Sequence, residues 1–216
     1  SLRADGNFRW SCIGKTFTQI ISSYIPGIFS TSTTDRPYQD EVDFTARIQD
    51  TTYIKRLAGI QLNIPQSSVI QGQIDGSQRF LNINAQIPSM TYGSEHLQNV
   101  QWRIESSHQY LQTSMVMDRL MKGKPVEMGV DAYTRNNQIM ANMHWDNHRQ
   151  PSQKGEISLT GELTKDETGN QYIKGRISPS DVIVSDTVWK FHAANIRWKD
   201  HIMSLDTLRI AQGDRY

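Results

Sequence analysis

The residues that most often carry chemistry are few and scattered in this chain. It has six histidines and a single cysteine, Cys12. His144 and His148 are spaced like metal ligands on a helix, but an extended chain would hold them roughly 13 Å apart, too far to share one ion. Cys12 has no histidine near it, and the chain contains neither a Gly-x-Ser-x-Gly elbow nor a phosphate-binding loop. We therefore expect no enzyme activity, no cofactor and no metal ion.

The charged residues suggest no catalytic pair and no nucleic-acid partner. Asp40-Glu41 and Asp166-Glu167 fall in a predicted linker and a predicted turn, so we expect solvated loop charges rather than a glycosidase pair. The net charge is +1, whereas binding of nucleic-acid phosphates needs a basic patch.

The ends of the sequence and its longest apolar runs give an expectation about the parent protein. No apolar run is long enough to predict a transmembrane helix, and no signal peptide precedes the first strand pattern. The chain starts abruptly and stops directly after a strand-like pattern. We therefore expect it to be a piece excised from a longer protein.

The strongest pattern runs from 97 to 147, where apolar and polar residues alternate through four consecutive segments. Because successive side chains of a strand point to opposite faces, each segment predicts a strand with one apolar face. The apolar positions are Val100, Trp102 and Ile104; Leu111, Thr113, Met115 and Met117; Val126, Met128, Val130 and Ala132; and Ile139, Ala141, Met143 and Trp145. We expect these apolar faces to line up into one long surface.

Two helices are predicted near the start of the chain. Residues 7–13 read as a short strand, and Phe17, Ile20, Ile21, Tyr24 and Ile25 then form one stripe at helical spacing. We expect this helix to pack on the end of a sheet. A second strand-helix unit follows a polar linker at 30–40, with its helix over 51–58.

The remaining sequence predicts an antiparallel meander, for about a dozen strands in all. Residues 1–66 hold the strand-helix units, and residues 67–216 hold the sheet. Near the start of the sheet, Asp75-Gly76 predicts a hairpin with a two-residue turn. The expected fold is therefore all-β with two short helices, in one continuous domain. The alternation fits both an open, apolar-lined trough and a closed β-sandwich.

The apolar face is the candidate site. By residue type alone, ordinary core packing explains such a face. However, a one-sided sheet of this size needs a cover, and only two short helices are available. Methionine is flexible and polarisable, and suits surfaces that accommodate irregular apolar partners. The predicted lining residues are Trp102, Met115, Met117, Met128, Val130, Met143, Leu159 and Ile173.

Several phrases in the chain resemble a family of bacterial envelope proteins. They are IQGQIDG at 70–76, LNINA at 81–85, YG at 92–93, LQNV at 97–100, YIKRL at 53–57 and PSDVIVSDTVW at 179–189. Together they resemble the TamB-like, AsmA-related proteins of Gram-negative bacteria, and most closely the large Bacteroidetes versions called translocation and assembly module proteins. The likeness covers most of 44–211 and consists of degenerate β-repeat phrases.

The resemblance implies a periplasmic segment of a long protein anchored in the inner membrane. Such proteins resemble a U-shaped, lipid-lined trough of repeated strands and are linked to phospholipid transport and outer-membrane protein assembly. The implied partners are phospholipid or fatty acyl chains and outer-membrane assembly proteins. The family has no catalytic residues to carry over, and this chain lacks its N-terminal membrane helix and C-terminal domain.

Two other functions remain open at this point. A closed β-sandwich could bind glycan or protein, and aromatic residues exposed together on one polar face would favour it, with Trp189, Trp198 and Tyr133 as candidates. A hydrolase on a jelly roll would need carboxylates or histidines clustered in a cleft.

Overall fold

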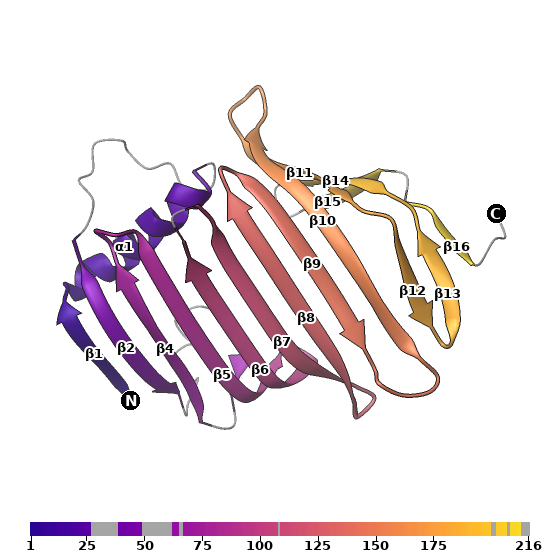
Figure 1. Cartoon of the computed structure of the whole chain (residues 1–216), viewed down its shortest axis with the longest axis horizontal. Helices are drawn as coiled ribbons and strands as arrows, with labels where there is room; N and C mark the ends of the chain where they lie inside the picture. The colour runs from indigo at the N-terminus through magenta and orange to yellow at the C-terminus, as the bar shows by residue number, and fades with distance from the viewer. Residues whose placement is uncertain are drawn as a thin grey trace.

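The computed structural model describes residues 1–26, 39–48, 62–64, 67–107, 109–199, 202–206 and 208–212. Within these ranges it contains one helix and one 16-stranded sheet (Figure 1). The helix is α1 (Trp10–Tyr24). The strands are β1 (Leu2–Asn7), β2 (Glu41–Ile48), β3 (Leu62–Asn63), β4 (Ser68–Asp75), β5 (Phe80–Tyr92), β6 (Glu95–Ser106), β7 (Leu111–Met121), β8 (Lys124–Arg135), β9 (Gln138–Asp146), β10 (Gln153–Lys165), β11 (Gln171–Ile177), β12 (Ser180–Val184), β13 (Thr187–Phe191), β14 (Ala194–Lys199), β15 (Ile202–Asp206) and β16 (Ile210–Gln212).

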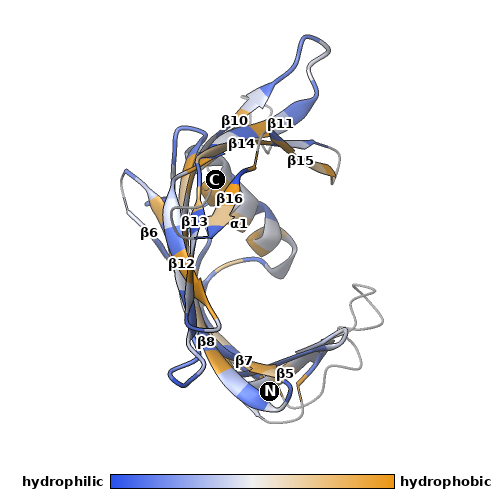
Figure 2. Cartoon of the chain, turned by 90° about the vertical axis from the view of Figure 1, so that its right-hand side faces the viewer, coloured by the Kyte–Doolittle hydropathy of each residue, from blue (hydrophilic) through white to orange (hydrophobic). Residues whose placement is uncertain are grey.

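The sheet is an open antiparallel meander. Its main path runs β1-β2-β4-β5-β6-β7-β8-β9-β10-β11-β14-β15, and β1 and β15 form its two ends. Viewed along its long axis, the sheet has a C-shaped section that encloses a trough (Figure 2). The expectation of an all-β open meander is therefore confirmed, and the closed sandwich is not formed.

The sheet forks at β10. One edge of β10 pairs with β9 over 154–162, whereas its other edge pairs with β12 over 153–155 and with β11 over 159–165. At the fork the amide of Ser178 donates a hydrogen bond to the carbonyl of Ser158 at 2.9 Å. Two arms leave this point, β11-β14-β15 and β12-β13-β16. Periodicity within each strand carries no information about such a division.

Helix α1 begins earlier than the sequence predicts. The strand expected over 7–13 is wrong, because β1 ends at Asn7 and the helix starts at Trp10. Ile13 packs against the core together with Phe17 and Ile21, so the helical stripe extends back through the segment that was read as a strand. The second predicted helix, over 51–58, lies outside the described residues.

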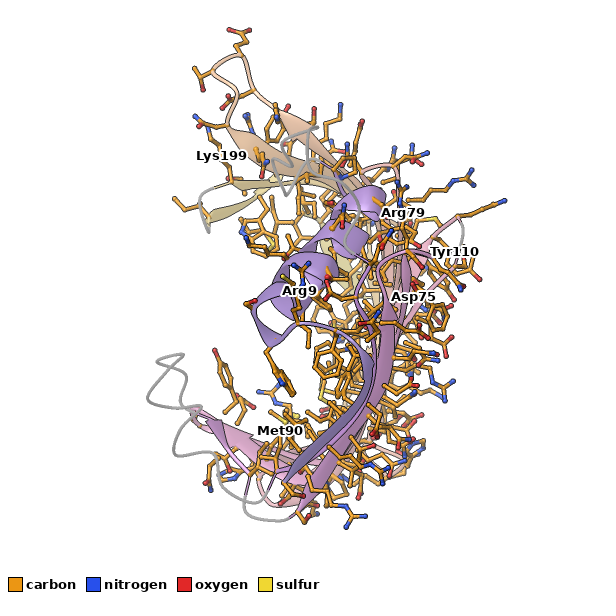
Figure 3. All side chains as sticks on the ribbon, turned by 90° about the vertical axis from the view of Figure 1, so that its left-hand side faces the viewer. Arg9, Asp75, Arg79, Met90, Tyr110 and Lys199 are labelled. Carbon is orange, nitrogen blue, oxygen red and sulfur yellow. The ribbon has the colours of Figure 1, made fainter. Side chains whose placement is uncertain are left out.

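The helix lies inside the curve of the sheet, not at the sheet's end as predicted (Figures 2 and 3). Its buried residues Ile20 and Tyr24 pack with Ile25 on apolar side chains of the concave face. The buried members of this core cluster from the sheet are Val42, Ile74, Leu81, Leu111 and Leu163. The helix therefore supplies the cover for one side of the trough.

Both ends of α1 are held by polar contacts. Asp40 is buried and accepts hydrogen bonds from the amide of Arg9 at 2.9 Å and from the hydroxyl of Thr16 at 3.1 Å. At the other end the Tyr24 hydroxyl donates to the carbonyl of Ser107. The expectation that Asp40 is a solvated loop charge is wrong, because it satisfies donors at the helix N-terminus.

The turn after β4 is longer than the predicted two-residue hairpin. Residues 76–79 separate β4 from β5, and the Asp75 carboxylate accepts hydrogen bonds from the amides of Ser77 and Gln78. Burial by itself would raise the pKa of Asp75, but hydrogen bonds from Ser77 and Gln78 outweigh it and lower the pKa. Because the Asp75 carboxylate binds amides of the turn that follows it, it favours this longer connection.

Truncation of the core beneath α1 should destabilise the fold. Leu81 is 0% exposed, so Leu81→Ala leaves a cavity and is expected to lower the free energy of unfolding by about 2–5 kcal/mol in urea denaturation. The matched control is Leu208→Ala at a side chain that is 41% exposed, where a change within about 0.5 kcal/mol is expected. Equal losses in both variants would contradict this assignment of the core.

Candidate functional site

Cross-strand register places the predicted lining residues on one face. Directly opposed residues of antiparallel strands share a face, as do residues two apart on one strand. Leu111 lies in the core cluster beneath α1, so Met115 and Met117 on the same strand also face the trough. Cross-strand pairs and two-residue intervals of this kind connect all eight predicted residues to Leu111. All eight therefore face the concave side.

Four of the eight form a continuous line across neighbouring strands. This middle row pairs Ala46, Ile70, Ala85, Trp102, Met115, Val130, Met143 and Ile157 in order from β2 to β10. Beside it, an outer row pairs Met117, Met128, Trp145, Gly155 and Val182 from β7 to β12. The expectation that the apolar faces line up is thus met strand by strand.

Most of the middle and outer rows stays accessible because α1 covers only the adjacent part of the face, although Ala85 and Val182 are buried. In the middle row Met115, Val130 and Met143 are half-buried, and Trp102 is 43% exposed. The Trp102 indole N–H donates to the Thr113 hydroxyl at 2.8 Å, which fixes the ring on the trough floor.

The remaining two predicted residues lie outside these rows. Leu159 is opposed by Ala141 and Ile177 in the line between the middle row and the residues beneath α1. Ile173 packs against the core cluster, so it belongs to the covered part of the trough. The structure therefore brings six of the predicted residues into two adjoining open rows.

Sequence reasoning missed several lining residues. Ile70, Ala85, Ile157, Trp145 and Val182 continue the two rows but were not among the predicted set. Their alternation was visible, yet membership of a row depends on register between strands. The lengths of the turns between neighbouring strands were the sequence signal from which this register could have been predicted.

Glycines make room for two rings that lie over neighbouring strands. A Cβ on Gly155 would come within 2.6 Å of the Trp145 ring, so this indole occupies the trough floor above Gly155. On the convex face, a Cβ on Gly129 would come within 2.1 Å of the His144 ring. His144 therefore packs on the sheet. Among the described residues no three His, Cys, Asp or Glu side chains are grouped to hold a metal ion.

One ion pair lies on the concave face at the rim. Arg119 follows Met115 and Met117 at two-residue steps, and its guanidinium binds Glu95 through two hydrogen bonds of 2.6 and 2.9 Å. A bulge brings Glu95 to this face, because the register shifts by one residue near Asn99, which has φ 52°. The hydrogen bonds from Arg119 hold the pKa of Glu95 below its ordinary value.

A second ion pair ties β14 to the turn between β10 and β11. The Lys199 ammonium lies 2.6 Å from the Asp166 carboxylate, whose side chain is 17% exposed. The hydrogen bond from Lys199, followed by that from Thr168, keeps the pKa of Asp166 far below its ordinary range. The expectation of a solvated charge at Asp166 is therefore wrong, because the carboxylate holds a turn and a strand together.

The convex face does not gather the three aromatic residues predicted for a glycan platform, although the ring of Tyr133 contacts that of Tyr110, with centroids 6.1 Å apart. Trp189 lies opposite Val182 on the concave side. Tyr133 lies opposite Gln112 on the convex side, whereas Trp198 lies opposite Ile173 and Met203 on the concave side. Other convex positions bind one another, as in the hydrogen bond from Arg103 to Asn84 at 3.0 Å.

Comparison with protein-family models, curated proteins and solved structures finds no match to this chain. In the part of the chain that the structure describes, no helix is both long and apolar enough to span a bilayer.

The rim ion pair should give a pH-dependent stability. A carboxyl group whose folded pKa is depressed stabilises the fold when ionised, so the contribution is complete above its ordinary value of 4.5 and is lost as pH falls through the folded pKa. We expect the difference in unfolding free energy between wild type and Arg119→Met to shrink over that window. Denaturation curves from neutral to acidic pH measure it.

The control for this titration is Arg149→Met. The Arg149 guanidinium donates to the backbone carbonyl of Pro125 at 2.9 Å, and a carbonyl does not titrate. Its effect on stability should be far less dependent on pH. A pH-independent effect of Arg119→Met would contradict the assigned role of Glu95.

Proposed function

We propose that the open part of the trough binds acyl chains of phospholipids or fatty acids. The observation that carries the proposal is the part of the middle row from Trp102 to Ile157, an uninterrupted line of half-buried and exposed apolar side chains on a curved face. Trp102, Met115, Val130 and Met143 provide contact area, and the methionines adapt to a flexible chain.

The dimensions of the middle row suit this ligand. From β6 to β10 the row crosses four strand spacings, roughly 19 Å. One leaflet of a bilayer has a hydrocarbon layer of roughly 15 Å, half the thickness of the hydrocarbon core. An acyl chain lying across these strands would therefore be covered over most of its length on one side.

The free energy expected from partly burying an acyl chain favours reversible binding. Each fully buried CH₂ contributes about 0.8 kcal/mol, so a partly covered chain gains enough to bind and can still leave. Headgroups would stay at the wet opening, where the Arg119–Glu95 pair lies at the rim.

At the level of the whole protein, we propose a non-enzymatic segment of an envelope-spanning lipid-transfer or outer-membrane assembly protein. The support is the sequence resemblance to TamB-like proteins together with an open trough of consecutive strands. In this proposal the segment works in the periplasm, the parent protein is anchored in the inner membrane, and outer-membrane assembly proteins are its partners.

The test is native mass spectrometry of the purified chain, with organic extraction of bound lipid. Met117→Asp and Val130→Asp each place a carboxylate on the trough floor, so bound lipid should be lost. A penalty of about 1.4 kcal/mol already lowers affinity tenfold, and desolvating a charge costs more.

The control is Met140→Asp, since Met140 is 56% exposed on the opposite face of β9. It should leave lipid occupancy unchanged, and circular dichroism should show all three variants folded. Lipid retained in the two trough variants, or lost equally in Met140→Asp, would contradict the proposal.

A further inference from the structure

A polar cavity of about 340 Å³ lies where the C-terminal end of α1 meets three turns of the sheet. The last turn of the helix forms one wall, and Arg79 lies beside it (Figure 3). The turns contribute Gln78 and Arg79 between β4 and β5, Gln109 between β6 and β7, and Arg135 and Asn136 where β8 meets β9. The cavity therefore gathers side chains from segments that are far apart in the sequence.

The described residues that line this cavity include two positive side chains and no negative one. Arg79 and Arg135 supply guanidiniums, and Gln78, Gln109 and Asn136 supply neutral amides. Two larger cavities of the sheet differ, because carboxylates line both of them together with basic groups. Since a guanidinium has five N–H donors and no acceptor, donors outnumber acceptors in the cavity at α1. Such a lining is typical of a site for an anion.

The turn between β4 and β5 holds Arg79 at the cavity. The Arg79 carbonyl accepts a hydrogen bond from the Ser106 hydroxyl at 3.3 Å, which fixes its backbone. Asp75 is the nearest carboxylate in the sequence, but it accepts hydrogen bonds from the amides of Ser77 and Gln78 at 2.9 and 3.0 Å. Asp75 is thus engaged within its own turn, and the Arg79 guanidinium is left for a ligand.

Arg135 reaches the cavity from the end of β8. The turn that follows it is tight, with φ of 50° at Asn136 and 65° at Asn137. The Arg135 guanidinium donates a long hydrogen bond of 3.4 Å to the side-chain oxygen of Gln109 on the opposite wall. Within the described ranges, no carboxylate forms an ion pair with Arg79 or Arg135.

The helix end beside the cavity opposes an anion only weakly. A helix C-terminus carries about half a negative charge, whereas the two guanidiniums carry two full positive charges. The carbonyls of this end are also partly capped: that of Tyr24 accepts a hydrogen bond from the Asn137 amide at 3.2 Å, and that of Ile21 from the Ile25 amide at 3.1 Å. The net field in the cavity therefore favours negative charge.

We propose that this cavity binds a phosphate group. A planar guanidinium donates two parallel hydrogen bonds to two oxygens of a phosphate, and a tetrahedral phosphate has oxygens for two guanidiniums and the neighbouring amides. A free phosphate ion and a phospholipid headgroup carry this same group. The site itself does not depend on the proposed lipid binding, and only the headgroup as its source rests on that proposal.

NMR titration of the purified chain with sodium phosphate at low ionic strength tests the site. Amide signals of Arg79, Gln109 and Asn136 should shift and saturate in wild type. The double variant Arg79→Gln/Arg135→Gln should bind phosphate more weakly by about tenfold or more, because charge-assisted hydrogen bonds are lost. Added sodium chloride should weaken binding to wild type.

The matched control is Arg47→Gln/Arg176→Gln, which removes the same net charge at two exposed arginines that do not line this cavity. It should bind phosphate like wild type, and circular dichroism should show both double variants folded. Wild type without saturable shifts, or equal weakening in the two double variants, overturns the proposal.

A soluble short-chain phosphatidate distinguishes the two sources of phosphate. If a headgroup is the ligand, dihexanoyl phosphatidate should bind wild type more tightly than inorganic phosphate, and Val130→Asp should remove this difference. If free phosphate is the ligand, the two should bind wild type alike. Because inorganic phosphate has no acyl chain, its binding tests the cavity even where the trough binds no lipid. Phosphatidate that binds wild type and Arg79→Gln/Arg135→Gln equally contradicts the site.

Discussion

The structure depends on the need to cover one apolar face of a sheet whose strands alternate for the most part between apolar and polar residues. A sheet of this kind can bury that face against a second sheet, against helices, or by curling. Here α1 covers the line through Val42, Ile74 and Leu81, and curvature shelters the rest only in part. The exposed remainder of the face, not any reactive side chain, is what gives this molecule a candidate function.

Several polar residues on the concave side have hydrogen-bond or ion-pair partners, whereas the buried hydroxyl of Ser180 has none within the described ranges. Ser106 accepts a hydrogen bond from the amide of Leu81 at 2.6 Å beside the core, and Thr113 accepts one from Trp102. Arg119 and Glu95 neutralise each other at the rim. Because Ser106, Thr113, Arg119 and Glu95 already have partners, the floor beside them presents mainly apolar surface, which agrees with a ligand held by contact area rather than by directed hydrogen bonds.

For strands β7 to β9, sequence alone was sufficient to predict the strand and the face that each residue occupies, because alternation is a local property. It therefore located Met115 and Val130 correctly on one surface. It failed over 7–13, where α1 begins, and at Glu95, whose face is set by the bulge near Asn99. It could not supply the row to which each lining residue belongs, nor the position of α1, since both depend on contacts between distant segments. Asp40 also could not be assigned from its sequence neighbours, which suggest a charge in a loop. Its hydrogen-bond partners are Arg9 and Thr16, which lie far before it in the sequence, on the other side of the polar linker.

The fork at β10 divides the far end of the sheet into two parts that are unequally attached. The β11 arm joins β10 through seven opposed residue pairs, whereas the β12 arm joins it through three. Because local opening requires only the contacts of the part that opens, the β12 arm forms the less stable cooperative unit. The mouth of the trough at this end can thus widen by fraying of one arm while β1 to β10 stay paired.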